Sequence, residues 1–211
     1  MGAWPVLLLL ALLAWGCATP APATFRHPDF RPDAIRRPAV LIRVSLDRTA
    51  APGDGGLSPR ARSPLADAFE IGFLEGLNAR GILPLDTTLS AHLGDRPLPV
   101  PQAERQRALE RARALKADAM LIVSVVVSRL DLVYCRDARR PFAARTTLWT
   151  VSAEVLRVAD GARLLFEPPS PGLRLTDVEP DCDAGRIERR LSSQELLDAA
   201  VQRSLSVLLG R

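Results

Sequence analysis

The segment from Ala119 to Val133, AMLIVSVVVSRLDLV, constrains the fold of this chain more than any other part of it. It is strongly hydrophobic and rich in β-branched residues, which lose rotamer freedom in a helix but pack well on a pleated sheet. We therefore predict one long strand at the centre of a β-sheet. The segment Pro38–Leu46 (PAVLIRVSL) has the same character and predicts a second central strand.

A hairpin is predicted after the long strand. Thr146–Val158 alternates apolar and polar residues and predicts a strand, while Arg136–Arg145 before it reads as a basic loop. Asp160-Gly161 is typical of a two-residue turn of the primed type. Ala162–Phe166 is then expected to return antiparallel to the preceding strand.

The first predicted helix begins at Ser63, an N-cap residue, with Pro64 at the first helical position, and ends at Gly81. Apolar residues recur along it at spacings of three and four, which gives one buried face. Gly72 and Gly76 lie on that face one turn apart, so we expect the helix to approach the sheet closely.

Two further helices are predicted. Gln102–Lys116 has a charged outer face and an inner face that includes Leu115. Ser192 and Glu195 form a capping-box pattern at the start of a final amphipathic helix. Together, the strands and helices predict an α/β (α+β) fold with a single mixed β-sheet and two to three helices packed on it.

Prolines and glycines mark the connecting segments. Ser90–Pro101 and Pro168–Gly185 are predicted to be loops, and Ile82–Leu85 a short strand fragment. A Gly-rich loop, Gly53–Gly56, follows the first strand, but it lacks the Lys-Ser/Thr ending of a phosphate-binding loop. We interpret it as a surface loop.

The N-terminal segment predicts export and lipidation. A ten-residue apolar run, Val6–Trp15, is too short to span a bilayer and is followed by Gly16 and Cys17. This pattern resembles the lipobox of a bacterial lipoprotein signal, in which the cysteine becomes the acylated first residue. The alternatives are an ordinary secretory signal with an incidental cysteine and a start codon assigned at the wrong position.

These features divide the chain into three parts: a signal peptide over residues 1–16, a proline-rich flexible tether over residues 17–37, and a single domain over residues 38–211. An exported chain meets an oxidising compartment, so we predict a disulfide between Cys135 and Cys182, with two buried free thiols as the alternative. The expected disulfide would bring the basic loop and an acidic loop together.

Charge argues against binding to nucleic acid. The 28 basic residues, of which only Lys116 is a lysine, are interleaved with 24 acidic ones, and no motif combines basic and aromatic residues. We therefore expect no nucleic-acid partner.

Residues suited to catalysis are few. The two histidines are His27, in the predicted tether, and His92, in a predicted loop. Neither belongs to a recognisable catalytic or metal-binding motif, although a hydrolase site using His92 could assemble in space. We expect no enzyme activity, no cofactor and no metal site.

An acidic segment over residues 177–188 (DVEPDCDAGRIE) partly matches the spacing of a calcium-binding loop. The match is incomplete because Cys182 occupies the position of the usual glycine and Pro180 interrupts the segment. We interpret it as a solvated acidic loop and keep an ion- or ligand-sensing role as an alternative.

The order of elements resembles the small α/β domain of Gram-negative envelope proteins. This group includes the amino-terminal domain of TolB, the curli secretion lipoprotein CsgG and the penicillin-binding-protein activator LpoB. The similarity is carried by ALKADAMLIVSVVV and RVADGARLLF and covers about Pro38 to Gly210. Ser124 replaces the usual glycine of the family, and the amphipathic hairpins of the curli pore are missing.

The resemblance implies a non-enzymatic adaptor or assembly factor that is attached to a membrane by lipid and contacts another envelope protein. Ala18 rather than an aspartate follows Cys17, which favours the periplasmic face of the outer membrane in lipoproteins of this kind.

Overall fold

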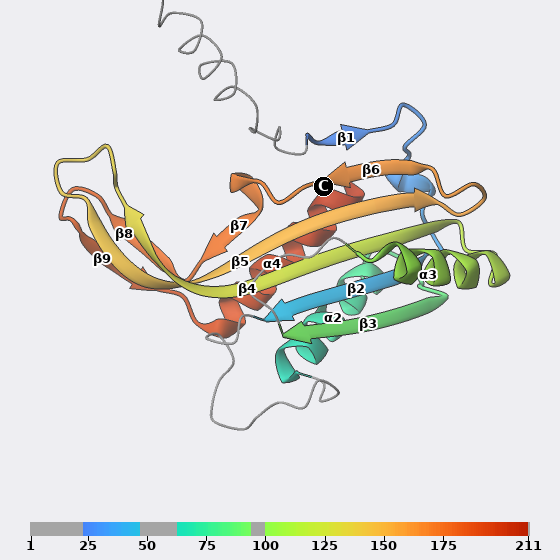
Figure 1. The fold of residues 1–211 in the computed structure, drawn as a ribbon, viewed down its shortest axis with the longest axis horizontal. Helices are drawn as coiled ribbons and strands as arrows, with labels where there is room; N and C mark the ends of the chain where they lie inside the picture. The colour runs from blue at the N-terminus through green and yellow to red at the C-terminus, as the bar shows by residue number, and fades with distance from the viewer. Residues whose placement is uncertain (1–22, 47–62, 94–99, 211) are drawn as a thin grey trace, which may run out of the picture.

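The structure, a computed structural model, describes residues 23–46, 63–93 and 100–210. The predicted signal peptide and Cys17 lie outside these residues. A seven-stranded mixed sheet has the order β1-β6-β5-β4-β2-β3, and β7 also pairs with β5 (Figure 1). The strands are β1 (Phe25–Arg26), β2 (Ala39–Leu46), β3 (Asp86–Leu93), β4 (Ala119–Tyr134), β5 (Phe142–Arg157), β6 (Arg163–Glu167) and β7 (Arg174–Thr176).

Three α-helices and a second, two-stranded sheet complete the architecture. The helices are α2 (Pro64–Asn78), α3 (Gln102–Ala114) and α4 (Ser193–Leu209), and the small sheet pairs β8 (Val178–Asp181) with β9 (Arg186–Arg190). Two 3-10 turns, η1 (Pro32–Ala34) and η2 (Pro171–Leu173), lie in the connections. The predicted α+β class is confirmed, although the small sheet adds to the single sheet expected.

The centre of the large sheet is formed by the two strands predicted to be central. β2 pairs in parallel with both β3 and β4, and β4 pairs antiparallel with β5 along the full length of both strands. The β-branched side chains of these strands are therefore buried at the centre of the sheet, where such residues pack well.

The two faces of the sheet are covered differently. α2 and α4 pack on one face and form the main core with alternate residues of β2, β4 and β5, such as Ile42, Val123 and Val151. α3 covers only part of the other face, where Leu109 packs with Leu41 and the start of β4. Figure 1 shows α3 on the opposite side of the sheet from α2 and α4.

The glycines of α2 face a helix rather than the sheet, which corrects the expectation from the sequence. A Cβ atom added at Gly76 would lie 2.3 Å from Cδ1 of Leu205 in α4, and one at Gly72 would lie 3.4 Å from Cγ2 of Val201. The absence of a side chain at position 76 thus lets α2 and α4 approach each other closely. Ser63 is the N-cap residue of α2, but its side chain makes no capping hydrogen bond.

The predicted capping box of α4 is confirmed. The Ser192 hydroxyl accepts a hydrogen bond from the Glu195 backbone N–H, and the Glu195 carboxylate accepts one from the Ser192 N–H at 2.7 Å. The hydrogen bond that the Glu195 carboxylate accepts from the Ser192 backbone N–H is the largest cause of a lowered pKa for Glu195, and the nearby Ser192 hydroxyl lowers the pKa further. Gly210 ends the helix in the left-handed conformation.

Two predicted connections contain strands. Asp86–Leu93 forms β3, although Ser90–Pro101 was expected to be a loop and the strand to lie at Ile82–Leu85. Among the described strands, β3 pairs only with β2, and an edge strand of this kind tolerates the polar residues that made the segment resemble a loop. The expected loop Pro168–Gly185 contains β7 and β8.

Two smaller expectations are also wrong. The hairpin connection spans residues 158–162 rather than two residues, because Val158 remains buried under α3 and Gly161 supplies the positive φ of the turn. The backbone N–H of Gly161 donates to the Arg157 carbonyl at 2.8 Å. Leu115, expected to face inward, is 46% exposed just beyond the end of α3.

The predicted tether is partly folded. Within its described residues, β1 pairs antiparallel with β6, and Phe30 and Ile35 are buried in the main core. The prolines that suggested an extended linker include Pro32, which begins the η1 turn. The folded body therefore includes the described residues before position 38.

Candidate functional site

The far ends of β4 and β5 form a two-stranded extension, which we call the β-arm and define as Ser128–Tyr134 with Phe142–Leu148. It projects from the sheet beyond the helices (Figure 1). The two strands continue their antiparallel register to the Tyr134–Phe142 pair, whose rings stack with centroids 5.7 Å apart. One face of the β-arm carries Arg129, Asp131 and Val133, all exposed, so part of this extension is open to solvent.

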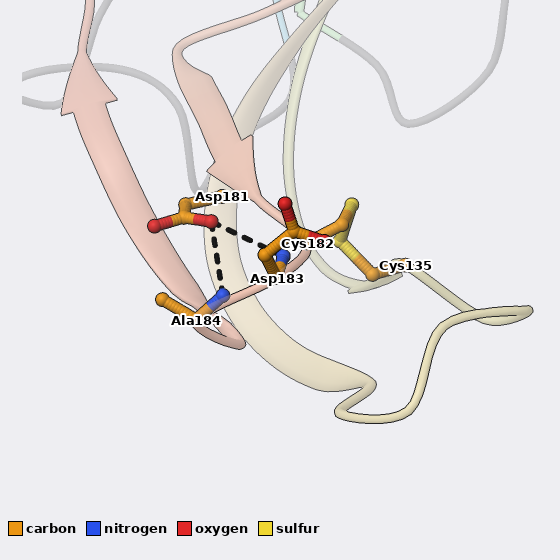
Figure 2. Close-up of a disulfide and its surroundings, with 5 residues drawn as sticks. All are labelled: Cys135, Asp181, Cys182, Asp183 and Ala184. Carbon is orange, nitrogen blue, oxygen red and sulfur yellow. Dashed lines mark hydrogen bonds between the residues drawn. A yellow bond between two sulfur atoms is a disulfide. The ribbon is translucent and has the colours of Figure 1, made fainter.

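The β8–β9 hairpin is fastened to the β-arm by covalent and polar links. The disulfide joins Cys135, at the end of β4, to Cys182, with 5.4 Å between their Cα atoms (Figure 2). This is the pairing that the sequence predicts. Asp177 accepts a hydrogen bond at 2.5 Å from the hydroxyl of Thr146 and one at 2.8 Å from the backbone N–H of Thr147. These contacts limit independent movement of the two hairpins.

The tip of the β-arm is basic. Arg136, Arg139 and Arg140 are all exposed in the turn between β4 and β5. Gly185, in the turn of the other hairpin, lies against Arg140: an added Cβ would be 2.5 Å from the Arg140 Cβ. The two turns therefore touch and present a common end.

Acidic residues of the segment 177–188 pair with arginines of their own hairpin and not, as expected, with the basic loop. The Asp177 carboxylate is 3.2 Å from Arg190, and that of Asp181 is 3.6 Å from Arg186. Asp181 also accepts backbone hydrogen bonds from the following turn (Figure 2). In the described residues, no three His, Cys, Asp or Glu side chains come together as metal ligands would.

The structure describes the side chain of His27 but only the backbone of His92. Nδ1 of His27 accepts a hydrogen bond at 3.1 Å from the backbone N–H of Asp29, close to β1. His92 lies on β3, where its backbone is in register with that of Ser45, but its side chain lies outside the described residues.

A cavity of about 370 Å³, lined by both apolar and polar residues, lies on the face of the sheet that α3 covers only in part. Its floor includes a row across three strands, because Arg43 is in register with Ser124 and Ser124 with Ser152. The preceding row is Leu41, Ile122 and Glu154. Both rows therefore contribute to the cavity, which is lined by polar side chains together with apolar ones such as Ile122.

Ion pairs line this cavity. The carboxylate of Glu154, only 5% exposed, receives hydrogen bonds from Arg105 of α3 and, at 2.6 Å, from Arg163 of β6. The Arg43 side chain is 4% exposed, and its Nε lies 3.6 Å from the Glu104 carboxylate. This site was not predicted from the sequence, although Arg43 and Ser124 interrupt otherwise apolar strands.

Comparisons with known proteins give only distant similarities. No family model and no curated protein matches the chain. A solved structure of the PelC dodecamer from Paraburkholderia phytofirmans is 17% identical, with a TM-score of 0.42 over 90% of this chain and 96% of that one. A lipoprotein from Neisseria meningitidis is 11% identical, with a TM-score of 0.32 over 78% of this chain and 93% of that one. We base no functional argument on similarity at this level.

Proposed function

We propose that this chain is a lipoprotein, attached through Cys17 to the periplasmic face of the outer membrane, that acts as a non-enzymatic adaptor or assembly factor for an envelope protein complex. The lipobox-like sequence before Cys17 supports attachment by lipid. The Cys135–Cys182 disulfide is typical of a protein that folds in an oxidising compartment. Among the described helices, none is long and apolar enough to cross a bilayer.

The observation that carries the adaptor proposal is the β-arm with its fastened hairpin. A projecting element that is already ordered loses little conformational entropy when a partner binds it. Its tip combines three exposed arginines, Arg136, Arg139 and Arg140, with exposed Val133 nearby on the arm. This surface would fit a protein partner that carries an acidic patch, because complementary charge steers and orients association.

Neither alternative function gains a supporting contact from the described residues. An envelope hydrolase using His92 would need a hydroxyl nucleophile and a carboxylate within hydrogen-bond distance of that ring. An ion sensor using residues 177–188 would need free carboxylates, but Asp177 and Asp181 are already bonded to backbone N–H groups and arginines.

Metabolic labelling with a palmitate analogue tests the attachment. We expect the wild-type chain to incorporate label and fractionate with outer membranes, and a Cys17→Ser variant to incorporate none. A labelled Cys17→Ser protein, or an unlabelled wild type, would contradict lipidation at Cys17. Cys135 and Cys182 serve as internal controls, since their thiols are consumed by the disulfide.

Site-specific photocrosslinking in cells tests the adaptor role. A photoreactive residue at position 139 is compared with one at Arg203, an exposed residue of α4. We expect a discrete adduct from position 139 alone, lost when Arg136 and Arg140 are both changed to Glu. Equal adducts from both positions, or an adduct that survives the charge reversal, would refute a partner at the tip.

A further inference from the structure

The end of the sheet at which β2, β3 and β4 begin has an exposed basic surface, at the opposite end of β4 from the β-arm (Figure 1). We define the amino-end face as the exposed residues Arg36, Arg37, Leu83, Leu115 and Lys116. We infer that this face rests on an anionic phospholipid surface. The inference deepens the proposed function, because it rests on attachment of the chain to a membrane and names the part of the body that meets the lipid.

Backbone hydrogen bonds hold the amino-end face in place. The backbone N–H of Leu83 donates to the Arg36 carbonyl at 2.8 Å, and that of Asp118 donates to the Arg37 carbonyl at 3.2 Å. One carboxylate oxygen of Asp118 accepts the backbone N–H groups of both arginines, each at 2.7 Å. These bonds join the three segments that enter β2, β3 and β4, so the exposed side chains extend from an ordered base.

Two leucines project from this base beside basic side chains. Leu83 is 61% exposed, more than any other large hydrophobic residue in the described part of the chain, and Leu115 is 46% exposed. Lys116, the only lysine of the chain, follows Leu115 with a positive φ of 56°, at the end of α3 where glycine is the most common residue. Exposed leucines next to lysine and arginine are typical of surfaces that lie in the interface of a bilayer.

Carboxylates near the face do not cancel its positive charge. They belong to Asp33, Asp86, Asp118 and Asp160. Asp86 is paired with Arg111 at 3.1 Å, and Asp160 with Arg157 at 3.4 Å. Asp33 shares a groove with Arg36 and Arg80. The basic residues of the face and of this groove therefore outnumber the two carboxylates that are left, and complementary charge favours an anionic lipid surface.

The segment before β1 is long enough for a lipid on Cys17 to enter the bilayer that this face touches. Arg157, which is in register with Ala119 at the start of β4, lies 3.3 Å from the carboxylate of Asp29. Four residue steps separate Asp29 from Phe25, whereas eight separate Phe25 from Cys17. An extended segment before Phe25 can therefore span the distance from Phe25 back to the amino-end face.

Sedimentation with vesicles tests the inference on the chain from residue 17 onward, with Cys17→Ser in place of the lipid. This chain contains every described helix and strand. We expect it to bind vesicles of equal parts phosphatidylcholine and phosphatidylglycerol, and to bind vesicles of phosphatidylcholine alone much more weakly. Arg36→Gln combined with Arg37→Gln should weaken binding to the anionic vesicles about 25-fold, or about fivefold for each charge. Because this chain carries no lipid, the result is independent of the labelling test of Cys17.

Matched variants separate the amino-end face from other surfaces. Arg139→Gln combined with Arg140→Gln removes the same charge from the tip of the β-arm and should weaken binding far less. Leu83→Ser should weaken binding about 10-fold, whereas Ile71→Ser, at an exposed position in the middle of α2, should leave it unchanged. No binding to anionic vesicles, equal binding to both kinds of vesicle, or an equal loss in the β-arm variant would overturn the inference. A lower molecular mass for Leu83→Ser than for the parent chain without vesicles would also overturn it, by showing that the face joins copies of the chain.

Discussion

Replacing the two glycines of α2 by alanine should change the stability of the protein in opposite directions. Both positions are inside the same helix and face α4, but the space beside them differs. The new methyl group would meet Val201 at 3.4 Å from position 72, an ordinary contact, and Leu205 at 2.3 Å from position 76. Leu205 is fully buried, so it has little room to move away.

The magnitudes follow from two opposing effects. Alanine is favoured over glycine inside a helix by about 1 kcal/mol, which applies equally to both substitutions. Overpacking a buried contact costs about 1–3 kcal/mol, which applies to Gly76→Ala alone. We expect Gly72→Ala to raise the free energy of unfolding by up to about 1 kcal/mol and Gly76→Ala to lower it by about 0–2 kcal/mol.

Urea denaturation followed by far-UV circular dichroism measures both variants. Their difference cancels the helix-propensity effect and gives the packing cost directly, about 1–3 kcal/mol. Adding Leu205→Val to Gly76→Ala should cost less than the sum of the single changes, because the shorter side chain relieves the contact. If both alanine variants are equally stabilised, α2 and α4 are not as close as described.

Cys135→Ser should lower the free energy of unfolding by about 4 kcal/mol in urea, because the disulfide with Cys182 closes a loop of 47 residues. An equally stable variant would contradict this. Ser192→Ala should lower the free energy of unfolding by about 1 kcal/mol, measured by thermal unfolding, because the N-cap of α4 is lost. Because its pKa is lowered in the fold, Glu195 should stabilise the protein above the ordinary glutamate pKa and lose that effect as pH falls through the lowered value. The difference in the free energy of unfolding between the wild type and Glu195→Gln should therefore shrink in acid. A difference that does not change with pH would contradict a lowered pKa for Glu195. Glu154→Ala should lower the free energy of unfolding by about 3 kcal/mol, because it leaves Arg105 and Arg163 without their shared carboxylate. A much smaller loss in urea denaturation would contradict this and show that water replaces the carboxylate.

Elements defined by local chemistry were predictable from the sequence. The β-branched runs of β2 and β4 and the capping box at Ser192 each depend on a few neighbouring residues. The pairing of Cys135 with Cys182 was predicted from the expectation that the chain is exported. Elements stabilised by long-range pairing were not. β1 is a strand only because β6 supplies its hydrogen bonds, and β8 forms despite Pro180 because β9 pairs with it.

The cavity next to α3 could not be predicted from the sequence for the same reason. Arg43 and Ser124 each interrupt an apolar strand, a signal that is visible in the sequence. Their meeting depends on the parallel register of β2 and β4, which the sequence does not reveal. The position of α3, which leaves this part of the sheet uncovered, is likewise a product of tertiary packing.

The short β1 strand restricts where the protein can work if Cys17 carries the proposed lipid. The first described strand begins at Phe25, and seven residues separate Phe25 from Cys17 in the sequence. A fully extended chain advances about 3.5 Å per residue, so the eight steps from Cys17 to Phe25 span no more than about 28 Å. The body would then stay within a shallow layer above the bilayer, and a partner would have to enter that layer to meet it.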